Sequence, residues 1–204
     1  MDSLCEMIQT LAQQPVTLAL VALSAGGLLL LFGGSSWHPL LMWPLSIALA
    51  ILAGGPPLCE MALLRAALGL FATVILLLGR GAPAPSSWRI RLGALAMRTL
   101  SGGLAAAAAV SFVQTSGLIP DHPEAWRALA GVGALGAVHA LVSRAPRGVA
   151  TGIIILLMAL EGALWLFRPS LLVLAGSSAL ALMVALAGAL HQEVHLADLV
   201  EKEA

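Results

Sequence analysis

Long apolar runs, separated by proline, glycine and charged residues, constrain this chain more than any other feature. A helix needs about 20 mostly apolar residues to cross the hydrocarbon layer of a bilayer. Runs of that kind cover residues 15–33, 39–54, 57–79, 93–118, 125–143, 148–167 and 170–190. Of the 204 residues, 60% are hydrophobic and only 10% are charged, whereas about a quarter are charged in soluble domains. The sequence therefore predicts an all-α fold, a polytopic membrane helix bundle with about seven transmembrane helices.

The apolar runs follow one another so closely that we expect a single integral membrane domain over residues 1–204. No polar interval is long enough to form a separate soluble domain. The first run is preceded by Asp2 and Glu6 without a basic segment, which predicts a retained span and not a cleaved signal peptide. The last segment, 191–204, reads "HQEVHLADLVEKEA" and is predicted to be a polar cytoplasmic tail.

Arginines in the predicted loops indicate how the chain is oriented. Arg80, Arg89 and Arg91 lie between the third and fourth runs, and Arg144 and Arg147 lie between the fifth and sixth. Short loops rich in arginine and lysine stay on the cytoplasmic side of a membrane. We therefore expect a multi-pass protein of the cell's inner (cytoplasmic) membrane, with the amino terminus outside and the carboxyl terminus in the cytoplasm.

Charge and motifs exclude several classes of function. The formal net charge is zero and Lys202 is the only lysine, so no basic surface is available for nucleic acid. The sequence contains no glycine-rich phosphate loop and no histidine, cysteine and carboxylate cluster at metal-ligand spacing. We predict no catalytic residues, no metal and no cofactor. Catalysis by the chain alone is not expected, and a role as accessory subunit of an oxidoreductase complex is left open.

Two charged residues inside the runs are predicted to meet. Charge inside a membrane is costly and usually faces a partner, water or the interior of the bundle. Glu161 lies about 9 Å from Phe167 along its helix, and Arg65 lies about 12 Å from Pro57 along the third run, so their depths are similar. Two interpretations of an Arg65–Glu161 pair remain open: a static clasp between helices, or a carboxylate that takes part in proton movement and is tuned by Arg65.

Two further ionisable residues are interpreted differently. His139 lies about 13 Å shallower than Glu161, so it is predicted either to hydrogen-bond with a neighbour or to act as a separate member of a proton relay. Glu60 lies one turn inside the start of a predicted helix, where the helix dipole favours a carboxylate. We interpret Glu60 as a capping charge.

Small residues and tryptophans indicate packing. "LSGGLAAAAAVSF" in the fourth run and "LAGVGALGAV" in the fifth allow helices to approach closely, but the pattern leaves open whether the neighbour belongs to this chain or to another subunit. The tryptophans lie mostly near the ends of the runs and are predicted to be interfacial anchors: Trp37, Trp43, Trp88, Trp126 and Trp165.

The stretch "SRAPRGVATGIIILLMALEGALWLF" is similar to the penultimate helix of hydrogenase-4 component E. The part at about 125–190 resembles, as three helices, the K subunit of respiratory complex I and the C subunit of Mrp-type antiporters. On this resemblance Glu161 occupies the place of the family's intramembrane glutamate, and Arg65 the place of a buried lysine. The last helix differs, because Ser177 and Ser178 stand where K-type subunits carry a second acidic residue.

The resemblance implies a small membrane subunit of a multi-subunit redox-linked or ion-translocating complex. Its partners would be other integral membrane subunits, antiporter-like, within the lipid bilayer. Glu161, Arg65 and His139 would contribute to a proton or cation path, and Ser177 and Ser178 would form its polar continuation in the last helix. Two alternatives remain: an independent small secondary transporter with Arg65 and Glu161 lining a substrate cavity, and a purely structural or assembly subunit.

Overall fold

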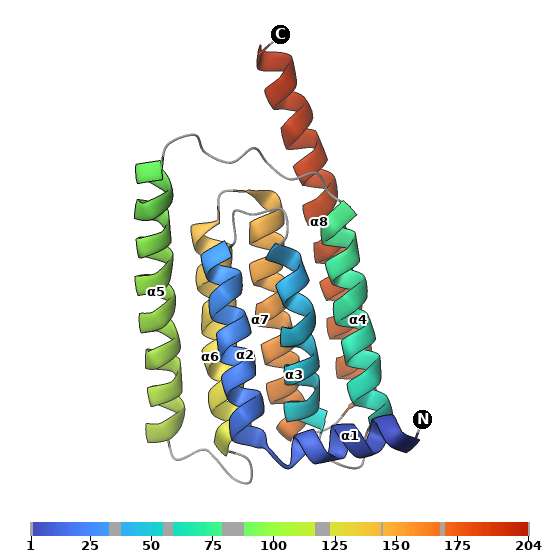
Figure 1. Cartoon of the computed structure of the whole chain (residues 1–204). Helices are drawn as coiled ribbons and strands as arrows, with labels where there is room; N and C mark the ends of the chain where they lie inside the picture. The colour runs from blue at the N-terminus through green and yellow to red at the C-terminus, as the bar shows by residue number, and fades with distance from the viewer. Residues whose placement is uncertain are drawn as a thin grey trace.

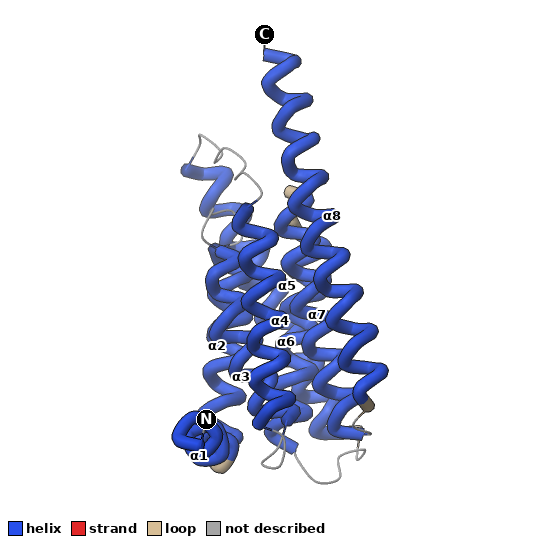
Figure 2. Tube along the Cα trace, turned by 90° about the vertical axis from the view of Figure 1, so that its right-hand side faces the viewer, coloured by secondary structure: helices blue, strands red, loops and turns tan. Residues whose placement is uncertain are grey.

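The computed structural model describes residues 2–32, 38–54, 59–78, 88–116, 123–143, 145–167 and 170–203. Within these ranges every regular element is helical and no strand occurs, which confirms the all-α prediction (Figure 2). The elements are α1 (Asp2–Ala12), α2 (Pro15–Phe32), the 3-10 helix η1 (His38–Leu41), α3 (Met42–Gly54), α4 (Cys59–Leu78), α5 (Trp88–Thr115), α6 (Pro123–Val142), α7 (Pro146–Phe167) and α8 (Leu171–Glu203).

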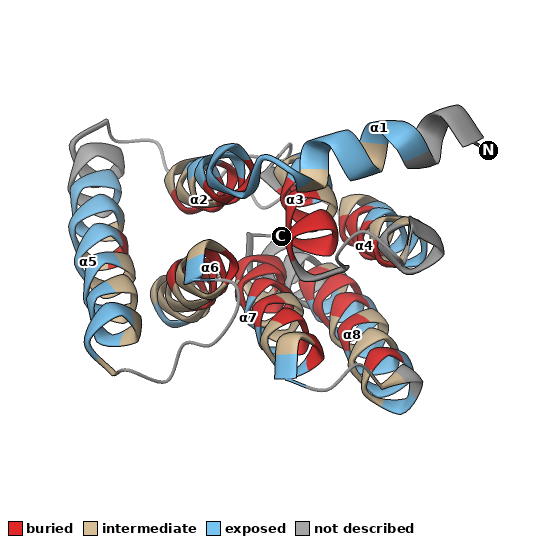
Figure 3. Cartoon of the chain, turned by 90° about the horizontal axis from the view of Figure 1, so that it is seen from below, coloured by how far each residue is buried: buried red, intermediate tan, exposed pale blue. Residues whose placement is uncertain are grey.

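Six of the helices form two facing rows. One row contains α2, α3 and α4, and the other contains α6, α7 and α8, so that α2 packs on α6, α3 on α7 and α4 on α8 (Figure 3). The fifth helix, α5, stands at the side of the bundle and packs on α6 and α2 (Figure 1). The first helix, α1, lies across one end, bent by 88° from α2. The polar tail continues α8 as a helix beyond the opposite end.

Prolines set the start of three of these helices. Pro15, Pro123 and Pro146 are the first residues of α2, α6 and α7, a position that suits proline because its missing N–H would have no partner there. Helix α7 therefore begins earlier than the expected run at 148. Arg147, predicted to lie in a loop, is instead in the first turn of α7 and only 4% exposed.

The small residues of α6 are used inside the chain. A Cβ on Gly136 would lie 2.8 Å from the backbone N of Leu156, and a Cβ on Gly152 would overlap the backbone of Ala140. A Cβ on Gly133 would lie 3.4 Å from the Cβ of Ala159. The glycine face of α6 therefore packs on α7 of the same chain, with backbone almost touching backbone.

Several helices have the length and composition of membrane spans. In the part of the chain that the structure describes, four helices are long and apolar enough: Leu95–Thr115, Pro123–Val142, Pro146–Phe167 and Leu172–Val194. The bent pair of α1 and α2 would make a fifth span, and the apolar parts of α3 and α4 are shorter. Large apolar side chains cover the outside of the bundle, including Leu78, Leu141 and Leu172, each more than three-quarters exposed. The chain is thus compatible with a multi-pass membrane protein, and the number of seven spans stays a prediction.

Candidate functional site: a buried carboxylate that joins three helices

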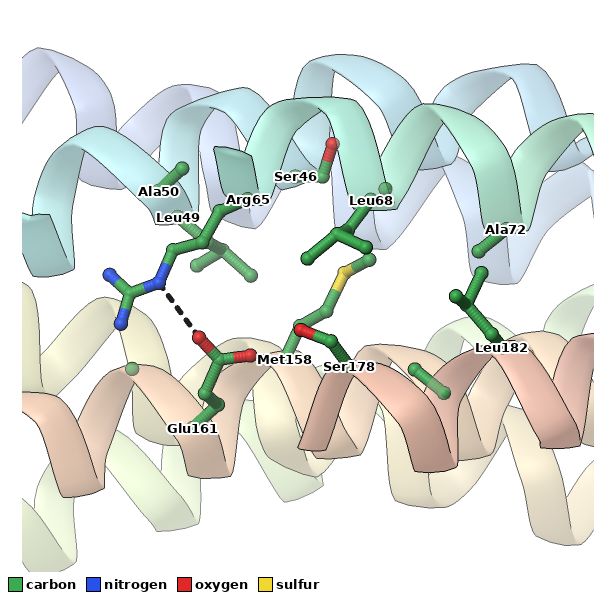
Figure 4. A pocket seen from close by; sticks show the side chains of 13 residues that line it. Ser46, Leu49, Ala50, Arg65, Leu68, Ala72, Met158, Glu161, Ser178 and Leu182 are labelled. Carbon is green, nitrogen blue, oxygen red and sulfur yellow. Dashed lines mark hydrogen bonds and ion pairs between the residues drawn. The ribbon is translucent and has the colours of Figure 1, made fainter. Parts of the chain in front are cut away.

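Glu161 connects α7 to both α4 and α8. Its Oε1 accepts a hydrogen bond from Arg65 Nε of α4 at 2.7 Å, and its Oε2 accepts one from Ser177 Oγ of α8 at 2.9 Å. Figure 4 shows the Arg65 and Glu161 side chains extended toward one another across the space between the two rows. Both carboxylate oxygens therefore have a donor, and each donor comes from a different helix.

Burial makes this pair different from an ion pair at a surface. Arg65 is 8% exposed and Glu161 is 9% exposed, so both charges have lost most of their contact with solvent. Removing one partner of a buried pair is strongly destabilising, although the pair as a whole adds little net stability. The expected meeting of Arg65 and Glu161 at one depth is what the structure shows, and it is compatible with both the clasp and the proton interpretation.

Trp165 completes the surroundings of Arg65. The Cζ atom of Arg65 lies 4.4 Å from the centroid of the Trp165 ring, which is the geometry of a cation–π interaction. Trp165 is four residues after Glu161 on α7, so both side chains lie on the same face of the helix. The interpretation of Trp165 as an interfacial anchor was wrong, because its side chain is buried. Its spacing from Glu161 was the signal that could have revealed it.

The guanidinium of Arg65 uses only part of its hydrogen-bonding capacity. Nε donates to Glu161, whereas the buried Nη1 and Nη2 atoms have no hydrogen-bond partner among the described residues. Buried polar groups usually have a partner in protein or in ordered water. The indole ring offers its π face to the cation, but it does not supply the in-plane acceptors that these N–H groups require.

A cavity of about 40 Å³ adjoins the pair. It is lined by residues of α3, α4, α7 and α8, and its polar lining residues are Ser46, Arg65, Glu161 and Ser178 (Figure 4). The remaining lining residues are leucines, alanines, glycines and Met158. Because a water molecule needs at least about 10–15 Å³ of such space, the cavity has room for water beside Glu161.

The structure separates some residues that the sequence analysis had grouped. His139 is buried on α6, and its Nε2 lies 3.9 Å from the point where a Cβ on Gly148 would be. Gly148 is about 20 Å along α7 from Glu161, so His139 does not join the pair directly. Ser178 lines the cavity, and Ser177 alone of the two serines bonds to Glu161. Glu60 falls in the first turn of α4, as expected, and its side chain lies outside the described part.

Comparison of the chain with protein-family models, with curated proteins and with solved structures finds no match in any of the three. The resemblance to hydrogenase-4 component E therefore stays a prediction. No three histidine, cysteine, aspartate or glutamate side chains gather into a metal site within the described ranges.

Proposed function

We propose that the chain is a small membrane subunit of a multi-subunit redox-linked or ion-translocating complex of the complex I, hydrogenase-4 and Mrp group. In this proposal Glu161 takes part in proton or cation movement, and the chain joins neighbouring membrane subunits. The observation that carries the proposal is the Arg65–Glu161 contact of 2.7 Å, buried between helices and next to a cavity large enough for water.

Glu161 is the one carboxylic acid among the residues that line this cavity. An arginine side chain stays protonated in proteins, and serine hydroxyls form hydrogen bonds without acting as acids. When Glu161 is ionised, the pair is neutral overall; when Glu161 is protonated, the pair carries one positive charge. Proton uptake therefore changes the charge in the middle of the bundle, and charged groups in a neighbouring subunit would respond to that change.

The size of the cavity argues against an independent transporter of organic solutes. Sites for small organic molecules occupy about 300–1,000 Å³, whereas the cavity at Glu161 measures about 40 Å³. Water or a bare cation fits a space of this size, and a metabolite does not. The static clasp stays in competition with the proton role, because a clasp needs the same contact between Arg65 and Glu161.

The test is the Glu161→Gln variant, purified in mild detergent with its partner subunits and reconstituted into sealed vesicles. Glutamine keeps the shape and accepts the Arg65 hydrogen bond but cannot exchange a proton, so we expect an assembled complex that has lost ion movement. Glu124→Gln is the matched control, since Glu124 forms a 2.8 Å pair with Arg127 that is about one-third exposed.

Undiminished proton or sodium movement in the assembled Glu161→Gln complex would leave Glu161 as a clasp. The proteins that co-purify with the wild-type chain test the other half of the proposal. Companion subunits with metal centres would support a redox-linked complex, and a chain that purifies alone and is stable alone would contradict the subunit assignment.

A further inference from the structure

The Arg65–Glu161 pair has different surroundings toward the two ends of the bundle. We call the end that carries α1 the α1 end and the end from which α8 projects the tail end (Figure 1). Helices α4 and α8 run from the α1 end to the tail end, and α7 runs the other way. Positions after Arg65 on α4 and before Glu161 on α7 therefore lie nearer the tail end.

Toward the α1 end, the pair is covered by Trp165. This residue lies one turn beyond Glu161 in that direction, is 6% exposed and stacks on the Arg65 guanidinium. The ring is large and apolar, and it is not among the residues that line the cavity. A proton moving from the α1 end to Glu161 would have to pass this stack and the fixed positive charge of Arg65.

Toward the tail end, the pair adjoins the cavity. On α4 the cavity reaches from Arg65 to Ala72, a length of about 10 Å along the helix, and on α8 it reaches from Ser178 to Leu182. Leu76, one turn beyond Ala72 on α4, is fully buried and does not line the cavity. A leucine side chain can change rotamer, so at this level it is a smaller obstacle than a stacked tryptophan ring.

Farther toward the tail end, α8 carries a buried amide. Gln192 is 1% exposed, and neither its Nε2 nor its Oε1 has a hydrogen-bond partner among the described residues. It follows Ser178 by nearly four helical turns, so both residues lie on the same face of α8. An amide buried without a protein partner is the kind of group that internal water satisfies. Ser178 and Gln192, the uncharged polar groups that could hold water on α8, thus lie on the tail side of Glu161. The partnerless Nη1 and Nη2 atoms of Arg65 belong to the guanidinium that stacks on Trp165.

We propose that Glu161 exchanges its proton with the tail end only, through water held beside Ser178 and toward Gln192, and that the Trp165–Arg65 stack closes the site to the α1 end. The inference rests on the proposed function in that it needs a protonatable Glu161. Arg65 and Glu161 are the only charged residues among those that α3, α4, α7 and α8 contribute to the cavity, so no other titrating group in its lining competes with Glu161.

The test uses the complex as purified, in sealed vesicles sorted by whether a tag on the carboxyl terminus is accessible from outside. Dicyclohexylcarbodiimide enters from both sides and adds to a protonated carboxyl to give a stable acylurea, which mass spectrometry measures on Glu161. The labelling rate follows the protonated fraction, so it changes by up to about tenfold per pH unit. We expect the rate to fall when the pH rises on the tail side, and to stay constant when the pH rises on the α1 side.

Two variants with matched controls test the assignment of the barrier and the path. Trp165→Ala should make labelling respond to the pH on both sides, whereas Trp43→Ala, which changes a half-exposed tryptophan on α3, should not. Ala181→Leu places a larger side chain in the cavity lining and should slow the response to tail-side pH, whereas Ala179→Leu on the exposed face of α8 should leave it unchanged.

Wild-type labelling that follows the pH on the α1 side would overturn the inference and leave the proposed function standing. Complete absence of Glu161 labelling at every pH would defeat the proposed function, and this inference with it. The wild-type result is sufficient for both decisions, so the inference remains testable even if Trp165→Ala fails to fold.

Discussion

Replacing Arg65 by alanine should destabilise the protein by an amount that depends on pH. The variant leaves Glu161 buried with Ser177 as its remaining donor. Neutralising an ordinary glutamate of pKa about 4.3 at pH 7 costs about 3.7 kcal/mol, at 1.36 kcal/mol per pH unit. Losing the stack on Trp165 adds about 1 kcal/mol. We expect the free energy of unfolding to fall by about 5 kcal/mol at pH 7 and by about 2 kcal/mol at pH 5.

The sign of this pH dependence follows from counting protons. In the folded variant the buried Glu161 holds a proton, and in the unfolded variant it releases that proton above about pH 4.3. The folded state therefore binds more protons, so the variant loses stability as the pH rises. The difference between the two proteins should therefore grow by about 1.4 kcal/mol per pH unit between pH 5 and pH 7.

Equilibrium unfolding in mixed detergent micelles at several pH values, followed by tryptophan fluorescence, would measure this difference. Arg127→Ala is the control, because the Arg127–Glu124 distance of 2.8 Å is similar but the side chains are 33% and 35% exposed. Such a pair contributes about 0.5 kcal/mol, without a steep pH dependence. An Arg65→Ala destabilisation that stays constant between pH 5 and pH 8 would refute the reasoning.

Three further outcomes are expected. Gly152→Ala should destabilise the protein by about 1–3 kcal/mol in a thermal melt, because the new methyl group overlaps the backbone of α6. Gly176→Ala is the control, because its methyl group meets no atom within 4 Å and should be neutral or stabilising. Ser177→Ala removes a hydrogen bond to a charged oxygen and should cost about 1.5–3 kcal/mol; an equal loss in Ser178→Ala would contradict this assignment. Cysteines introduced at Ser86 and Ser116, in a background lacking Cys5 and Cys59, should be labelled from opposite sides of the membrane, and labelling from one side would contradict the seven-span topology.

The depth of residues could be predicted from the sequence, and their direction around the helix axis could not. A helix rises about 1.5 Å per residue, so the apolar runs alone placed Arg65 and Glu161 at one level, where the structure pairs them. Which helices face each other depends on how whole surfaces pack, and no single run contains that information. For this reason the sequence grouped Ser177 with Ser178, and only the arrangement of the helices shows that Ser177 bonds to Glu161.

The sequence also gave wrong predictions for two residues at the ends of helices, Trp165 and Arg147. Tryptophan near the end of an apolar run is usually an interfacial anchor, but Trp165 turns inward because α7 presents Glu161 and Trp165 on one face. Arg147 was expected in a loop, and proline at the preceding position starts the helix early enough to bury it. At Trp165 the preference was overruled by the contact with Arg65 of a distant helix, and at Arg147 by the start of α7 at Pro146.

The direction of the two rows explains why α5 is where it is. The row of α2, α3 and α4 begins at the α1 end and finishes at the tail end, and the row of α6, α7 and α8 does the same (Figure 1). Each row contains three helices, so the first row ends at the tail end, whereas the second row begins at the α1 end. The chain must therefore return from the tail end to the α1 end before the second row can start. Helix α5 makes that return, and only 6% of the most apolar stretch within Leu95–Thr115 is buried inside the protein. Because each row has an odd number of helices, one returning helix is required, and α5 has to be long enough to run the length of the bundle. The outer face of α5 is free to vary without disturbing either row.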